Sequence, residues 1–197
     1  MTESTSRCAE HLTRYLIERP LNKELKLKNH ERVMNMNRCS KEIYYLNIAE
    51  AVSKRCTCLR RHYGAIIVKD DEVISTGYVG APRGRENCMD LKKCVREEQN
   101  IPRGERYELC RSVHAEANAI ISASRRDMIG STLYLAGLDA KTGSNVENAN
   151  SCAMCKRLII NAGIEKVIIK DGEEHYRVIH VKSWIEEDDS ITGILGY

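Results

Sequence analysis

The sequence predicts an α/β fold in which helices surround a mixed sheet. Two observations predict it. Helix-like stretches alternate with short apolar runs that suit buried strands, a pattern typical of layered α/β domains. The composition is that of a globular protein, with 42% hydrophobic and 30% charged residues in 197. This length suits one domain with a substantial buried core and a terminal extension.

The first strongly patterned element is a helix that begins at Ser40. Serine is a good N-cap, and apolar residues at helical spacing continue to about Arg55. Two strand-like runs follow at 64–69 and 72–78. The acidic pair Asp70-Asp71 between them predicts a hairpin with a tight turn.

The second half of the chain contains two predicted helix–strand pairs. Residues 114–125 predict a helix and 131–137 a strand. Residues 152–163 then predict a helix closed by its terminal glycine, and 165–170 predict another buried strand.

Three segments are expected along the chain. Residues 1–38 form an N-terminal extension, helical or mobile, which could serve oligomer contacts or act as a loose arm. Residues 39–180 form the domain that carries the chemistry. Residues 181–197 form a C-terminal segment that can become helical.

The charge balance argues against a dedicated nucleic-acid binder. The chain has 31 Lys and Arg against 28 Asp and Glu, a net charge of +3. Its long loop lacks the basic, aromatic-rich stripe that binds single strands. Its apolar runs are too short to cross a bilayer, and the N-terminus has charges where a signal peptide needs an apolar stretch. We therefore expect a cytoplasmic protein with no nucleic acid polymer or membrane partner.

Two short segments carry the residue types of a metal-dependent hydrolase. Cys152 and Cys155 lie three residues apart, on one face of a first helical turn, where the helix dipole favours the thiolate. His114 adds a nitrogen ligand at the start of another helix. Three protein ligands with a fourth position left to water is the arrangement of a catalytic zinc, whereas a structural zinc usually has four.

Glu116 is separated from His114 by one residue, so it can lean over the metal without binding it. There it can take a proton from the zinc-bound water, the nucleophile, and deliver it to a ring nitrogen and then to departing ammonia. The combination H-x-E and C-x-x-C is typical of zinc nucleobase deaminases. The alternative is a surface His-Ala-Glu with a chance or redox C-x-x-C, but both halves stand at helix starts, which favours the deaminase.

The chain has nine cysteines, which in a reducing compartment indicate metal more often than disulfides. Four of them lie in or beside the long loop at 79–112 and could close a structural zinc site that ties this loop to the domain. These four are Cys58, Cys88, Cys94 and Cys110. Buried free thiols are the alternative, since the four form no C-x-x-C pair, and Cys56 could compete with Cys58.

The chain resembles the deoxycytidylate (dCMP) deaminase family of the cytidine deaminase superfamily over about residues 40–170. The resemblance rests on three segments, HAEANAI, SCAMCKRLIINAGI and YGAIIVKDDEVISTGYVGAP. It implies a cytidine-deaminase-like three-layer sandwich with a mixed five-stranded sheet. It also implies hydrolysis of dCMP to dUMP and ammonia, which supplies thymidylate synthesis.

The resemblance further implies regulation and assembly. Members of the family form homo-oligomers, from dimer to hexamer, and many respond to dCTP as activator and dTTP as inhibitor. Mg²⁺ is expected only with such an effector nucleotide. The effector site is expected at the glycine-containing loop. Its residues are Gly77, Tyr78, Gly80, Pro82 and Arg83.

Several residues are candidates for substrate contacts. A monophosphate needs cationic donors, and Arg111 and Lys156 are the nearest to the two motifs in sequence. Tyr134 could stack on a pyrimidine, and Ala115 lies inside the first motif. The ordinary alternatives are solvated surface charges and a half-buried strand tyrosine.

Two positions depart from the family. Ser151 stands where the family has Pro before the first Cys, a mild change because serine is a good N-cap. The family pattern G-Y-N-G-x-P reads GYVGAP at 77–82, so Val79 replaces the Asn that would hydrogen-bond the substrate sugar. A hydroxyl that faces an isopropyl group loses a partner, at a cost of about 1–3 kcal/mol. Two alternatives follow: a deaminase of a different or modified pyrimidine nucleotide, or a nucleotide-binding homologue with weak or lost catalysis.

Overall fold

The computed structural model describes residues 38–188. By its contacts the chain divides into two units, Met1–Cys39 and Ser40–Tyr197, and the second carries the fold described below. The prediction for the N-terminal extension and that for the end of the C-terminal segment fall outside the described residues. Within 38–188, no helix is both long enough and apolar enough to cross a membrane.

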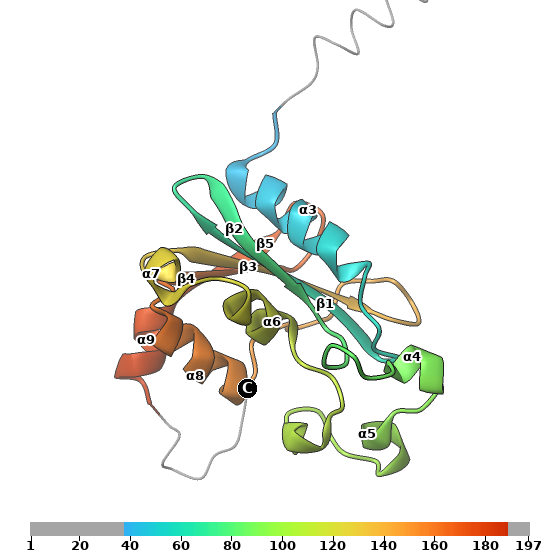
Figure 1. Cartoon of the computed structure of the whole chain (residues 1–197). Coiled ribbons are helices and arrows are strands. Elements are labelled where there is room, and N and C mark those ends of the chain that lie inside the picture. The colour runs from blue at the N-terminus through green and yellow to red at the C-terminus, as the bar shows by residue number, and fades with distance from the viewer. Residues whose placement is uncertain (1–37, 189–197) are drawn as a thin grey trace, which may run out of the picture. The chain divides into compact units, whose positions relative to one another are not determined.

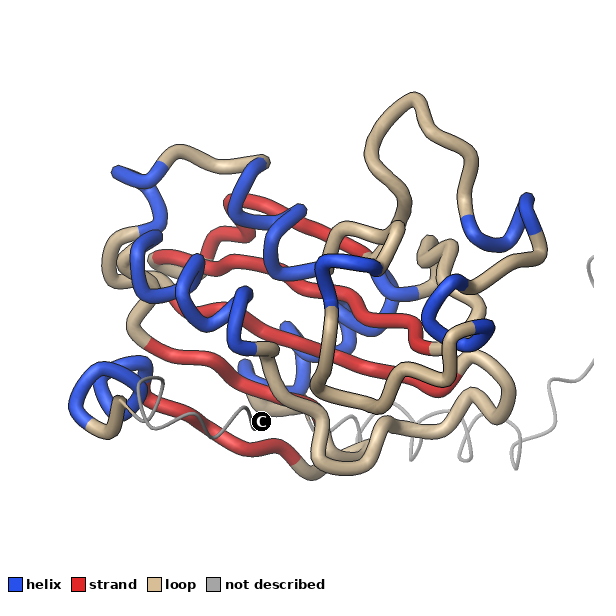
Figure 2. The backbone as a smooth tube through the Cα atoms, turned by 90° about the horizontal axis from the view of Figure 1, so that it is seen from below, coloured by secondary structure: helices blue, strands red, loops and turns tan. Residues whose placement is uncertain are grey.

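Five strands form a mixed sheet in the order β2-β1-β3-β4-β5 (Figures 1 and 2). The strands are β1 (Arg61–Lys69), β2 (Glu72–Tyr78), β3 (Thr132–Asp139), β4 (Lys166–Lys170) and β5 (Tyr176–His180). β1 runs antiparallel to both β2 and β3, β3 and β4 are parallel, and β5 returns antiparallel to β4. The predicted mixed five-stranded sheet is confirmed.

Helices cover both faces of this sheet (Figure 1). α3 (Lys41–Ser53) packs on β1 and β3 on one face, and α6 (Ala115–Ile121) packs on β2 and β1 on the other, beside α8 (Ala153–Ala162). The three-layer sandwich is therefore present. The remaining helices are α4 (Cys88–Leu91), α5 (Val95–Glu98), the 3-10 turn η1 (Tyr107–Leu109), α7 (Arg125–Met128) and α9 (Val181–Glu186).

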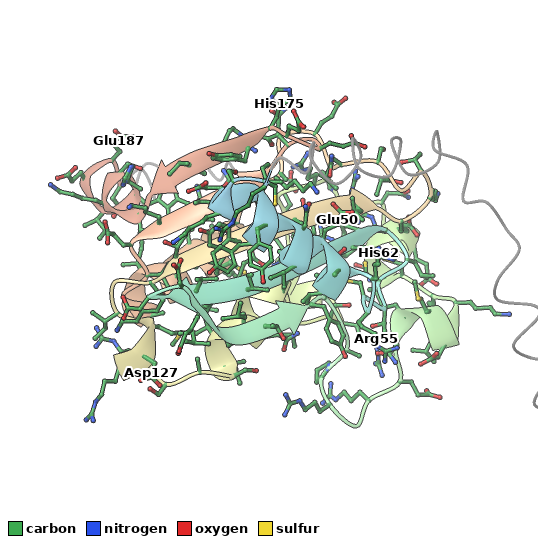
Figure 3. All side chains as sticks on the ribbon, turned by 90° about the horizontal axis from the view of Figure 1, so that it is seen from above. Glu50, Arg55, His62, Asp127, His175 and Glu187 are labelled. Carbon is green, nitrogen blue, oxygen red and sulfur yellow. The ribbon has the colours of Figure 1, made fainter. Side chains whose placement is uncertain are left out.

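Alternation along the strands divides the core between the two faces. In β3, Leu133 and Leu135 join the cluster under α6 and α8, whereas Tyr134 and Ala136 join the cluster under α3. The α3 face also holds an ion pair: the buried Lys170 at the end of β4 donates to Glu50 at 2.5 Å. Figure 3 shows Glu50 on α3, seen from this face.

The turn and cap residues act as their types predict. Ser40 caps α3 by accepting a hydrogen bond from the amide of Ile43 at 3.2 Å. Asp70 and Asp71 both adopt positive φ, 49° and 66°, as a two-residue hairpin turn requires. Gly163 ends α8 in the left-handed region at φ 81°.

Two elements differ from the sequence prediction. The helix expected over 114–125 ends at Ile121, because Ser124 accepts a hydrogen bond from the amide of Asp127 and starts α7 as a separate turn. The sequence pattern does not locate the fifth strand, β5, because it is a short edge strand with mostly exposed side chains and no apolar alternation.

Gly77 sets the distance between β2 and α6. A Cβ at this position would collide with the carbonyl oxygen of Ala115 and the amide nitrogen of Ala119, both helix backbone atoms. Because glycine has no Cβ, α6 can lie directly on β2 at this position. This contact fixes the start of α6, where the functional residues begin.

Candidate active site

The metal-binding side chains come from the starts of two helices. His114 is the N-cap residue of α6 and Cys152 that of α8, and Cys155 follows in the first turn of α8. Because α6 and α8 lie side by side under the sheet, the two starts meet. His114 Nδ1 lies 3.3 Å from Cys152 Sγ and 3.4 Å from Cys155 Sγ.

These distances suit a tetrahedral zinc. Ideal Zn–N and Zn–S bonds place the nitrogen and sulfur ligands about 3.6 Å apart, and the observed spacing differs from that only slightly. Within 38–188, this trio is the single group of three or more His, Cys, Asp or Glu side chains with all ligand atoms within 4.8 Å of one another. Both cysteines are buried, which excludes solvent from two sides of the site.

The electrostatics of the metal-free trio favour a thiolate at Cys152 and protons on Cys155 and His114. The pKa of Cys152 is lowered because its sulfur accepts hydrogen bonds from Cys155 and His114, while the pKa of Cys155 is raised by the same shared proton and by burial. Burial opposes charge on His114, but Cys152 and the Glu116 carboxylate outweigh it and raise its pKa. A divalent cation would replace the protons now shared by these groups.

Glu116 lies beside the trio without belonging to it. Its side chain is only 4% exposed, in the second position of α6, and it lines the same pocket as His114. Burial raises the pKa of this carboxyl group, and the neighbouring His114 lowers it in part. A buried carboxylate with a raised pKa beside a metal site is suited to gaining and losing a proton.

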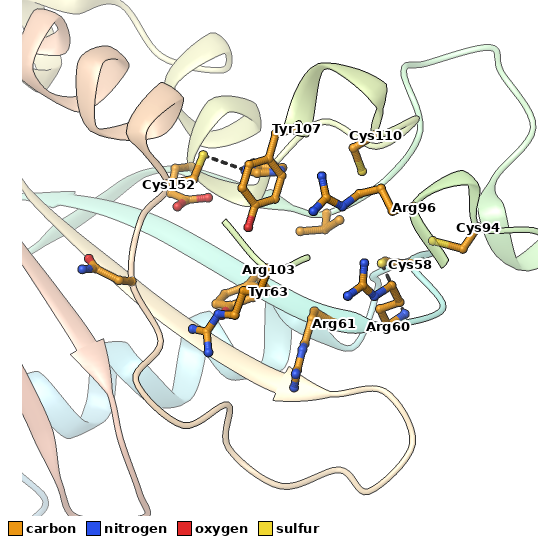
Figure 4. Close-up of a pocket in the computed structure, with 14 residues that line it drawn as sticks. Cys58, Arg60, Arg61, Tyr63, Cys94, Arg96, Arg103, Tyr107, Cys110 and Cys152 are labelled. Carbon is orange, nitrogen blue, oxygen red and sulfur yellow. Dashed lines mark hydrogen bonds between the residues drawn. The ribbon is translucent and has the colours of Figure 1, made fainter. Parts of the chain in front are cut away.

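A pocket opens from the metal ligands toward the long loop (Figure 4). At one end lie His114, Glu116 and Cys152, and Asn150 also faces the space. Four arginines are among the residues that line the rest of the pocket. They are Arg60, Arg61, Arg96 and Arg103. The pocket therefore joins an acid and a metal site to a strongly cationic wall.

The loop at 79–112 folds back over this pocket. The ring of Tyr107 meets the imidazole of His114 edge-on at 5.0 Å, and the guanidinium of Arg96 lies 4.4 Å from the Tyr107 ring centre. Arg103 donates to the backbone carbonyls of Glu147 and Asn148, at 3.2 and 2.9 Å. These contacts join the long loop to the segment before Cys152 and give the loop a role at the site.

The sequence prediction missed these arginines and Tyr107. Arg60 and Arg61 precede or begin β1, and Arg103 lies in the middle of a long loop, so none stands near the motifs in sequence. The one sequence signal for Arg60 and Arg61 is that they stand at the start of a buried strand.

Val79 lines the pocket, with 7% of its surface exposed. Tyr134 does not, which corrects the stacking prediction. Strand alternation places its ring on the opposite face of the sheet, 5.1 Å from the ring of Tyr45. Ala115 is fully buried in the core under α6 and does not line the pocket either.

The two predicted phosphate donors also lie elsewhere. Arg111 donates through Nε to the carbonyl of Glu86 at 2.9 Å, and it is not among the pocket residues. Lys156 points along α8 toward α9, with its ammonium 5.3 Å from the Trp184 ring centre. Nearness to the motifs in sequence did not place these side chains in the pocket. Arg111 precedes His114 and Lys156 follows Cys155, but each side chain makes its contact elsewhere.

The four loop cysteines are near one another without forming a compact ligand set. Cys58, Cys94 and Cys110 line the pocket, and Cys88 is buried with its sulfur 3.8 Å from the Ser112 hydroxyl. Burial raises the pKa of Cys58 and of Cys110, which favours neutral thiols. No three of them bring their sulfurs within 4.8 Å of one another. A second zinc therefore stays a prediction.

The expected effector loop is structured by backbone contacts. The carbonyl of Tyr78 accepts a hydrogen bond from Asn118 at 2.8 Å, and Gly80 exchanges two backbone hydrogen bonds with Val113. Pro82 is partly exposed and Arg83 is exposed, on the chain that leaves the sheet. An effector at this loop also stays a prediction.

Residues 39–171 match the family described as the cytidine and deoxycytidylate deaminase zinc-binding region. The chain belongs to this family. As a member it is a zinc-dependent nucleotide deaminase, a hydrolase, and the trio of His114, Cys152 and Cys155 is the group in the described structure that can hold the metal.

Individual deaminases of the family match over most of this domain. The chain is 36% identical over 137 residues to a deoxycytidylate deaminase of Mycobacterium phage D29, covering 68% of this chain and 96% of the phage protein. It is 31% identical over 134 residues to a deoxycytidylate deaminase of Schizosaccharomyces pombe, covering 68% of this chain but only 38% of the yeast protein. A solved dCMP deaminase of cyanophage S-TIM5 is 25% identical, with a TM-score of 0.46, and the match covers 66% of this chain and 81% of that one.

Proposed function

We propose that this deaminase hydrolyses dCMP to dUMP and ammonia. One observation carries the proposal: the same pocket is lined by His114, Cys152 and Glu116 at one end and by four arginines elsewhere (Figure 4). A nucleotide could place its pyrimidine at the metal-binding end and its phosphate beside the arginines. The name of the mycobacteriophage relative, a deoxycytidylate deaminase, supports this choice of substrate.

The chemistry divides between the metal and this chain's own residues. A zinc ion held by His114, Cys152 and Cys155 supplies Lewis acidity that makes water a nucleophile near neutral pH. Glu116 accepts the proton of the attacking water, passes it to the ring nitrogen beside the reacting carbon, and finally protonates the departing amine. Tyr107, packed edge-on against His114, keeps the imidazole in the orientation that aims Nδ1 at the cysteines.

The phosphate is assigned to Arg60 and Arg103. Arg61 already pairs with Asp139 at 2.8 Å, whereas the nearest carboxylate to Arg60 is that of Glu97 at 3.9 Å. The hydrogen bonds of Arg103 go to two backbone carbonyls, which leave its positive charge without a counterion among residues 38–188. A phosphate oxygen would supply that counterion and form charge-assisted hydrogen bonds.

Replacing Arg103 by glutamine tests the assignment. We expect the KM for dCMP to rise about tenfold or more, because a hydrogen bond between charged groups is lost. Turnover of deoxycytidine, which has no phosphate, should change far less. The loss of ultraviolet absorbance of the cytosine ring measures both rates. Arg111→Gln, outside the pocket, is the matched control. Equal effects on both substrates would contradict a phosphate contact, and no turnover of dCMP by the parent enzyme would overturn the proposed reaction.

Val79 favours a second candidate, a different or modified pyrimidine nucleotide as the best substrate. Asparagine at this position would add a hydrogen-bonding group to the pocket wall. We expect Val79→Asn to raise kcat/KM for dCMP, by up to about tenfold, if dCMP is the natural substrate. A panel of cytosine nucleotides, measured on both proteins, decides the matter. A parent enzyme that prefers another nucleotide over dCMP would establish the second candidate.

We also propose the finer properties that the family resemblance implies. They are regulation by dCTP with Mg²⁺ and by dTTP, a homo-oligomer, and a cytoplasmic location. The loop around Gly80 and Arg83 is the proposed effector site.

A further inference from the structure

One residue of the pocket lining has no hydrogen-bonding group on its side chain. This residue is Val79, which is apolar and nearly buried. A nucleotide bound as proposed would place its sugar between the two ends of the pocket, since the sugar connects the base to the phosphate. A sugar hydroxyl buried here without a partner would weaken binding.

Tyr63 lies beside Val79 and has a hydroxyl that no described residue engages. The two residues are joined by a backbone hydrogen bond, from the amide of Val79 to the carbonyl of Tyr63 at 3.1 Å. The Tyr63 side chain lines the pocket, and its hydroxyl has no hydrogen-bond partner among residues 38–188. In Figure 4 its ring lies next to Arg103.

The position of the Tyr63 ring is fixed by the strand that faces it. Tyr63 on β1 pairs with Gly137 on β3, and a Cβ at Gly137 would collide with the ring atoms of Tyr63. The ring therefore lies against the Cα of Gly137, in space that the side chain of any larger residue would fill. A ring held in this way presents its hydroxyl at one place, with little conformational freedom left to lose on binding.

The Tyr63 phenol lies within electrostatic range of groups at both ends of the pocket. Burial raises the pKa of Tyr63 to about 12; the Arg103 cation acts in the lowering direction and the Glu116 carboxylate in the raising direction. The phenol therefore lies close enough to both groups to sense their charges. It also stays protonated at neutral pH and can donate a hydrogen bond.

We propose that Tyr63 is a specificity-determining residue whose hydroxyl hydrogen-bonds the sugar hydroxyl of the nucleotide substrate, on a pocket wall where Val79 offers no partner. The inference rests on the proposed function, because the direction of the nucleotide in the pocket comes from it. Tyr63 holds the sugar, and it takes no part in proton transfer.

The test removes the hydroxyl from the protein and from the ligand in turn. Binding of dCMP and of 2′,3′-dideoxycytidine monophosphate is measured by calorimetry on the full-length, zinc-loaded Glu116→Gln protein, with and without Tyr63→Phe. We expect Tyr63→Phe to weaken dCMP binding about tenfold and to leave binding of the dideoxy nucleotide unchanged. Adding Val79→Asn to Tyr63→Phe should restore part of the loss.

Tyr134→Phe is the matched control, since this buried tyrosine lies on the other face of the sheet and should leave both affinities unchanged. Equal affinities of the Tyr63→Phe protein and its parent for dCMP, or equal weakening for both nucleotides, would overturn the inference. Turnover of dCMP by the wild-type enzyme is measured separately. Its absence would refute the proposed reaction, while the binding data would still decide the role of Tyr63.

Discussion

Replacing Glu116 by glutamine should reduce kcat for dCMP at least a hundredfold, about the smallest contribution expected of a general acid-base group. Glutamine has almost the same size, so the packing of α6 against the sheet should survive. The amide cannot accept the proton of the attacking water, which is the step assigned to this carboxylate. Zinc content, measured by atomic absorption, should stay at the parent value because Glu116 is not among the three ligands.

The control for this variant is Glu165→Gln, an exposed carboxylate just before β4 that should change neither rate nor zinc content. Loss of zinc from Glu116→Gln would mean that the carboxylate binds the metal. Retained turnover would mean that another group moves the proton.

Replacing Gly77 by alanine should destabilise the domain by about 3 kcal/mol or more, since an overpacked contact between backbones cannot relax by a rotamer change. The added methyl group would push α6 away from β2 and so displace both His114 and Glu116. We therefore expect a lower midpoint in urea unfolding together with weaker zinc retention during dialysis against a mild chelator.

Gly172→Ala provides the comparison. It lies in the turn between β4 and β5, and a Cβ there would meet only His175, at the ordinary distance of 3.7 Å. This variant should unfold within about 0.5 kcal/mol of the parent. If Gly77→Ala were equally stable and kept its zinc, α6 would not depend on close contact with β2.

The metal trio could be predicted from sequence because local rules determine it. Two cysteines at i and i+3 lie on the same face of any helix. The two helices that begin at His114 and Cys152 are separated by one strand, and in a compact α/β domain helices connected in this way pack side by side, which brings their starts together. The hairpin turn at Asp70 and Asp71 was predictable for the same reason, since two adjacent residues determine its geometry.

The substrate wall could not be predicted, because it depends on the path of a long loop. Arg103 reaches the pocket only when residues 79–112 fold back over β1, and no periodic pattern specifies that path. Tyr134 shows a second limit: β3 is apolar on both faces, so its sequence does not reveal which face a given side chain takes. Only the neighbouring strands and helices decide that.

The ligands of the metal come from the two sides of β3 in the chain, with His114 before it and Cys152 after it. The site is complete only when β3 has paired with β1 and β4 and the crossover through α8 has closed. A misfolded chain retains the same thiols and imidazole but scatters them, so it can take up zinc without assembling this geometry. Stoichiometric metal alone is thus a poor quality check for preparations of this protein; the coordination environment, seen in the charge-transfer spectrum of a cobalt-substituted sample, reports whether the topology is native.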